Sequence, residues 1–125
     1  MKKTPLKRTP NKKRQLANKA DKLWREIVLA LHPYCEVCGK PSNTGHHYYY
    51  RGSYAHLRYN IDNGIGLCVG CHFCLHHQDP KMIEDKIREK RGKKWVDKMR
   101  KLSEKRLKSF QTIAYYEAIL NQLSK

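Results

Sequence analysis

The chain lacks the features of membrane-spanning and secreted proteins. No apolar run approaches the roughly 18 residues that a helix needs to span a bilayer. The basic segment 1–14 contains no apolar stretch of the kind found in a secretory signal. We therefore expect a cytoplasmic protein in a reducing environment, with no membrane partner. In that environment, paired cysteines are more often metal ligands than disulfides.

Acidic residues are also scarce. The 11 Asp and Glu residues are set against 27 Lys and Arg residues, which leaves a formal net charge of +16. This excess predicts a polyanionic partner, and nucleic acid is the first candidate, ahead of a membrane surface. The mean hydropathy of −0.86 indicates a small apolar core. A structural metal ion can supply the stability that such a core lacks.

The chain divides into three predicted parts. Residues 1–15 form a basic arm, because segment 1–14 carries seven Lys or Arg residues and no acid. We expect this arm to be disordered and to contact phosphates, with a merely solubilising tail as the alternative. Residues 16–92 hold the core, and residues 93–125 form C-terminal helices. One apolar stripe in the last part can pack inward or against a second copy, so both monomer and homodimer stay open.

Apolar periodicity and turn residues predict an α+β fold. Asp79 and Pro80 suit the start of a helix, and Gly92 suits its end. Residues 46–50 are a short β-rich run that can form one strand, 51–60 resemble a loop, and 65–69 can form the opposing strand. The predicted elements are a helix over 16–31, strands over 46–50 and 65–69, and helices over 71–77, 80–91, 93–108 and 110–123.

The cysteines form two CxxC pairs, Cys35/Cys38 and Cys68/Cys71. A CxxC turn presents two thiolates to one ion, and two such turns complete the tetrahedral shell that zinc prefers. A redox role is the alternative for either pair alone. We predict a structural Zn²⁺ site that fastens the hairpin between the pairs. Cys74 is left over and is interpreted as a small buried side chain, with replacement of one cysteine of the cluster as the alternative.

Histidines gather around the same segment. His72 and His76 are four residues apart, so on a helix they face one side and can bind one ion. His46, delivered by the opposite strand, can add a third nitrogen. His47 follows it on the strand and must point the other way, which suits a general base that deprotonates water. Asn63 can hydrogen-bond the backbone across the loop and hold that base.

Two alternatives for these histidines remain. His77 can replace His76 as a ligand if the register of the helix differs. The histidines can also form a second structural zinc site rather than a catalytic one.

Three strings carry a family resemblance: Gly45-His46-His47, Asp62-Asn63-Gly64, and the run from Leu67 through Cys71-His72. Together they resemble HNH endonucleases of the phage type with a four-cysteine zinc knuckle, similar to NinG/Rap recombination nucleases. The resemblance implies a small zinc-stapled ββα-metal core flanked by N-terminal and C-terminal helices. It also implies a catalytic divalent ion, Mg²⁺, Mn²⁺, Ni²⁺ or Zn²⁺, bound by the histidine ligands.

The implied activity is hydrolysis of DNA phosphodiester bonds with low sequence specificity, in phage recombination or packaging within the host cytoplasm. In this interpretation His47 is the general base and Asn63 braces the loop. The alternatives are a non-catalytic zinc-stapled nucleic-acid-binding module and an RNA-directed nuclease. Basic residues on the loop and the arm are expected to contact phosphates: Arg51, Arg58, Lys7, Arg8, Lys12, Lys13 and Arg14.

Overall fold

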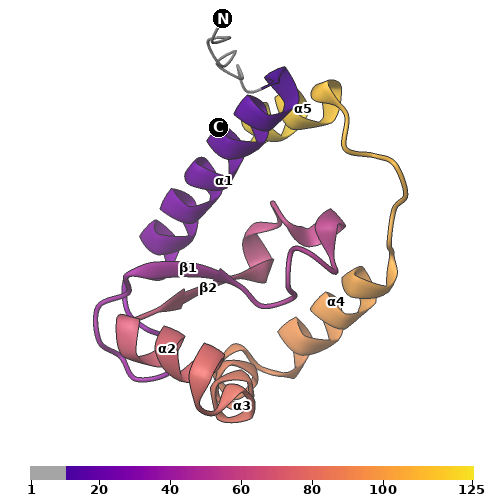
Figure 1. The fold of residues 1–125 in the computed structure, drawn as a ribbon. Helices are drawn as coiled ribbons and strands as arrows, with labels where there is room; N and C mark the ends of the chain where they lie inside the picture. Colours follow the sequence, from indigo (N-terminus) through magenta and orange to yellow (C-terminus); the bar gives the residue numbers. More distant parts are fainter. Residues whose placement is uncertain (1–10) are drawn as a thin grey trace, which may run out of the picture.

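A computed structural model describes residues 11–125, and that part of the chain is a small α+β protein. It contains five α-helices and a two-stranded antiparallel sheet, together with two short 3₁₀ turns at Ala55–Leu57 and Ile61–Asn63. Figure 1 shows the hairpin between α1 on one side and α2 and α3 on the other. The helices and strands are α1 (Lys12–Leu31), β1 (Thr44–His47), β2 (Gly64–Leu67), α2 (Val69–His77), α3 (Pro80–Arg91), α4 (Lys93–Glu104) and α5 (Ile113–Leu123).

Helix α1 begins earlier than its apolar pattern predicts. The side chain of Asn11 accepts a hydrogen bond from the Arg14 amide, which caps the helix ahead of Lys12. The predicted arm is therefore too long at its C-terminal end, because Lys12, Lys13 and Arg14 occupy the first turn of α1. Lys7 and Arg8 lie outside the described residues.

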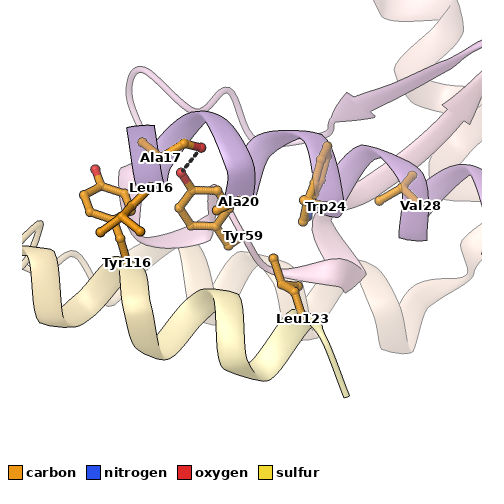
Figure 2. Close-up of a cluster of buried hydrophobic side chains, with 8 residues drawn as sticks. All are labelled: Leu16, Ala17, Ala20, Trp24, Val28, Tyr59, Tyr116 and Leu123. Atoms are coloured by element: carbon orange, nitrogen blue, oxygen red, sulfur yellow. Dashed lines mark hydrogen bonds between the residues drawn. The ribbon is translucent and has the colours of Figure 1, made fainter. Parts of the chain in front are cut away.

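The first core cluster joins α1 to α5 (Figure 2). The stripe of Leu16, Ala20, Trp24 and Val28 repeats every four residues along α1, so these side chains share one face. They pack against Tyr116 and Leu123 of α5, with Tyr59 between the two helices. The predicted apolar stripe of the last helix thus packs inward, onto the N-terminal helix.

The hairpin separates this cluster from a second one. Its register pairs His46 with Ile65 and His47 with Gly64. Since alternate residues of a strand face opposite ways, His46, Ile65 and Leu67 share one face and His47, Gly64 and Gly66 share the other. The first face covers a cluster with Leu75, Ile83 and Ile87 of α2 and α3.

The glycine face allows α1 to approach the hairpin closely. A Cβ atom added at Gly64 would lie 2.3 Å from Cγ2 of Val28, and one at Gly66 would lie 2.6 Å from the His32 carbonyl oxygen. Side chains at these positions would force the helix away from the sheet.

Among the helices after the hairpin, α3 has both predicted bounds, α2 and α5 have only the predicted end, and α4 has only the predicted start. Asp79 caps α3 through a 3.1 Å bond from the Met82 amide, and Gly92 separates α3 from α4 at a φ of +88°. Helix α4 ends at Glu104, short of the predicted 108, and α5 starts at Ile113 behind the Thr112 cap. The segment between them runs back toward α1 (Figure 1). No helix in residues 11–125 has the length and apolar character needed to cross a membrane.

Candidate functional site

The four cysteines of the two CxxC pairs come together. One sulfur atom from each of Cys35, Cys38, Cys68 and Cys71 lies within 4.8 Å of all the others. The sulfur atoms of Cys38 and Cys68 are 3.4 Å apart, against about 3.8 Å for two thiolates on one tetrahedral zinc with Zn–S bonds of about 2.3 Å. The cluster is therefore compatible with a structural zinc site, as the spacing predicts.

The surroundings of the cluster favour the metal-binding form of one thiol, Cys35, whereas burial and the neighbouring thiols raise the pKa of Cys71. Burial raises the pKa of Cys35, but hydrogen bonds from the backbone of Cys38, Cys68 and Val37 outweigh it and lower the pKa to about 7. Because the thiolate is the form that binds zinc, Cys35 is prepared for this role. Cys74 stays outside the cluster, half-buried against the second core.

A buried ion pair ties the first CxxC turn to α3, and sequence reasoning did not find it. Glu36 receives two hydrogen bonds from the Arg91 guanidinium, at 2.5 and 2.8 Å, and one from the Gly66 amide at 2.9 Å. Arg91 also donates to the Gly64 carbonyl at 2.7 Å. Burial alone would raise the pKa of Glu36, but the Arg91 contacts hold it below its ordinary value.

Three histidines converge on the opposite side of the sheet from α1. Each of His46, His72 and His76 offers a ring nitrogen within 4.8 Å of the other two. The Nε2 atoms of His72 and His76 are only 3.0 Å apart. Two ligands at about 2.1 Å from one ion are separated by about 3.0 Å at a right angle and about 3.4 Å in a tetrahedron. The donor set and its spacing thus fit a divalent ion, and His77 is not part of the cluster.

The electrostatics of this cluster also suit ligation. Burial, followed by the nearby rings of His72 and His76, lowers the pKa of His46 to about 4. The same two causes, burial and the neighbouring His76, lower the pKa of His72. Both rings are therefore neutral at pH 7, and the neutral imidazole is the form that coordinates metals. Three nitrogen ligands leave other positions of an ion open to water and substrate.

His47 occupies the other face of the hairpin, as strand alternation predicts. Its ring stacks on Trp24 with centroids 3.9 Å apart and planes within 3°. Its Nε2 lies 2.8 Å from the Arg58 carbonyl oxygen. Because a carbonyl only accepts, Nε2 carries the proton and Nδ1 keeps a free lone pair. Burial lowers the pKa of His47 despite the opposing Arg58 bond, so the ring is a neutral base at pH 7.

Asn63 makes the backbone contacts expected of it. It is fully buried, and its amide oxygen accepts from the Tyr49 amide at 2.8 Å. Its NH₂ group donates to the carbonyls of Tyr49 and Leu57, at 3.1 and 3.3 Å. One side chain therefore fixes both ends of the loop that follows His47.

The two loop arginines differ in how tightly they are held. Arg58 forms a forked pair with Asp21, at 2.9 and 2.5 Å, and its side chain is 20% exposed. Arg51 reaches the same carboxylate only at 3.5 Å and is 48% exposed. Asp21 and Trp24 were assigned no site role from the sequence. The one available signal was that Asp21 and Trp24 are three residues apart, on a helix that carries basic residues at Lys22 and Arg25.

The chain matches no protein-family model, no curated protein and no solved structure in the comparisons. What the geometry defines is a small α+β protein with a cysteine cluster compatible with structural zinc. A second cluster, of three imidazoles, lies on the side of the hairpin that faces away from α1.

Proposed function

We propose that this protein is a metal-dependent HNH-type endonuclease that hydrolyses DNA phosphodiester bonds. The observation that carries the proposal is the convergence of three imidazoles, one from β1 and two from α2. The residue after His46 on the strand is His47, which has a fixed ring and a free Nδ1. A purely structural metal site does not account for an oriented base at the next position of the strand.

The proposed roles follow from these positions. His46, His72 and His76 would hold a divalent ion, which when bound supplies stabilisation of negative charge on the phosphate. Nδ1 of His47 accepts a proton from water as the water oxygen forms a bond to phosphorus. The bond from phosphorus to the 3′ oxygen breaks, and a proton from solvent completes the 3′ hydroxyl. Asn63 keeps the loop beside His47 in place.

The charge of the chain supports DNA as the substrate. The net charge of +16 favours a polyanion, and the basic first turn of α1 is exposed at Lys12, Lys13 and Arg14. Arg51 on the loop after His47 is half-exposed and only loosely paired, so it is the loop arginine best placed to accept a phosphate. Contacts of this kind carry little sequence information, so specificity should be low.

Nicking of supercoiled plasmid tests the proposal, with Mg²⁺, Mn²⁺ or Ni²⁺ added to the zinc-loaded protein. We expect His47→Ala to lose roughly a hundredfold or more in rate, the usual contribution of a general base. His77→Ala is the matched control, because His77 is in the same helix as His72 and His76 but outside their cluster. It should cut within a few fold of the wild type.

A wild-type protein that binds DNA but never nicks it would leave the alternative, a non-catalytic zinc-stapled nucleic-acid-binding module. That module accounts for the charge and the cysteines but not for the three histidines. Equal lengths of DNA and RNA offered in competition decide the remaining alternative. Degradation of RNA with DNA spared would assign an RNA-directed nuclease.

A further inference from the structure

Helix α1 lies outside the hairpin and α2, yet it reaches His47 by two separate routes. The first route is direct contact. Trp24 is almost fully buried, and its Nε1 donates to the Asn60 carbonyl at 3.0 Å, which fixes the rotation of the indole. The imidazole of His47 lies parallel to that indole at 3.9 Å. The stack therefore fixes the plane of the His47 ring.

The second route passes through Arg58. Asp21 is buried on α1, three residues before Trp24 and so on the same side of the helix, and it binds the Arg58 guanidinium through two hydrogen bonds. The carbonyl of the same Arg58 accepts the bond from His47 Nε2. Asp21 thus holds the residue that decides which nitrogen of His47 carries the proton.

We propose that Trp24 and Asp21 are positioning residues for His47, and that Arg58 belongs to this support while Arg51 alone is left to bind phosphate. This inference rests on the proposed function. The stack sets the plane of the ring, and the Arg58 carbonyl sets its tautomer, so Nδ1 points in one direction with its lone pair free. Helix α1 supplies the stack directly, and it holds the Arg58 residue of the hairpin loop through Asp21.

The first test compares Trp24→Leu with Leu16→Ala. Both remove bulk from the same core cluster, but Leu16 lies about two helical turns along α1 from Trp24, the residue that stacks on His47. At a temperature well below both melting points, Trp24→Leu should lower kcat for nicking roughly ten- to a hundredfold, the cost of a misplaced catalytic group. KM should stay within about threefold, and Trp24→Phe, which keeps an aromatic face, should restore most of the rate.

Leu16→Ala should lose melting temperature but keep kcat. If Leu16→Ala and Trp24→Leu lower kcat equally for an equal loss of melting temperature, Trp24 acts only on stability and the inference is wrong.

A second readout does not depend on activity. In protein with ¹⁵N-labelled histidine at pH 7, long-range proton–nitrogen spectra report which nitrogen of His47 is protonated. We expect the Nε2-protonated form in the wild type, and a mixture of both forms in Trp24→Leu and Asp21→Asn. Unchanged spectra in both variants would overturn the positioning role. This measurement needs no DNA cleavage. A wild type that fails to nick DNA would therefore refute the proposed function without deciding the positioning of His47.

The two arginines supply the last comparison. Arg58→Lys cannot reproduce the fork to Asp21, so it should lower kcat with KM nearly unchanged. Arg51→Lys should mainly raise KM. The opposite pattern would place Arg58 on the substrate and remove it from the support of His47.

Discussion

The buried pair of Glu36 and Arg91 should contribute more to stability than any other ion pair in the described structure. The Glu36 side chain is 2% exposed and that of Arg91 is 12% exposed. Replacing Glu36 by Ala leaves the guanidinium without its carboxylate and the Gly66 amide without its acceptor. Removing one partner from a buried pair costs about 3–5 kcal/mol. Arg91 keeps its bond to the Gly64 carbonyl, so we expect the lower end, about 3 kcal/mol.

Chemical denaturation in saturating zinc measures this free energy of unfolding. The matched control is Asp85→Ala, which removes the carboxylate of an exposed pair with Arg88, also on α3, where the two side chains are 50% and 39% exposed. That change should cost at most about 1 kcal/mol. Equal losses in the two variants, or a loss below about 1 kcal/mol for Glu36→Ala, would refute the assignment of Glu36 as the anchor of the first CxxC turn.

The stability that Glu36 contributes should depend on pH, in a direction set by the lowered pKa of its carboxyl group. The folded pKa of Glu36 lies below its unfolded value, so its contribution is complete above the unfolded pKa, about 4.3. It is lost as the pH falls through the folded pKa. The difference in stability between the wild type and Glu36→Gln should therefore begin to shrink as the pH falls below about 4.3 and disappear only below the folded pKa of Glu36. Both proteins lose zinc in acid. Taking the difference between their free energies of unfolding at each pH removes this shared effect.

Other predictions test the cysteine cluster and the glycine face. Cys35→Ser and Cys68→Ser should each abolish the cooperative melting transition and bound zinc, because metal binding and folding are coupled in small sites; a normal melting curve in protein free of zinc would contradict this. Gly64→Ala should cost roughly 1–3 kcal/mol through its clash with Val28. Gly70→Ala, in a helix with open space around it, should be neutral or stabilising by up to about 1 kcal/mol. Thermal melts of Gly64→Ala and Gly70→Ala measure both effects, and equal melting temperatures would contradict the expected difference.

The parts of the site that depend on local geometry could be predicted from the sequence. A CxxC turn places two thiols together whatever surrounds it, and a helix brings His72 and His76 onto one side through their spacing of four. Alternation along a strand separates His46 from His47 for an equally local reason. These rules need no knowledge of how distant segments pack.

The contacts that hold these groups in place depend on tertiary packing instead. Arg91 is 55 residues from Glu36, and Arg58 is 37 residues from Asp21. Nothing in either local pattern singles out such partners among 27 basic residues. The stack of Trp24 on His47 was missed for a similar reason, because an apolar stripe on a helix predicts only a core position. Helix ends also differed, since caps at Asn11 and Thr112 set them rather than periodicity.

The bare face of the hairpin has a consequence for how this protein can vary. With hydrogen atoms at positions 45, 64 and 66, the backbone of the sheet itself is the surface on which α1 rests. Within the two strands, His47 is the one residue with a large side chain on that face. The distance between α1 and the sheet therefore determines the position of its imidazole. A single methyl group added at Gly64 or Gly66 would widen the gap between α1 and the sheet. Substitution at either glycine would therefore change how closely α1 packs against the His47 ring.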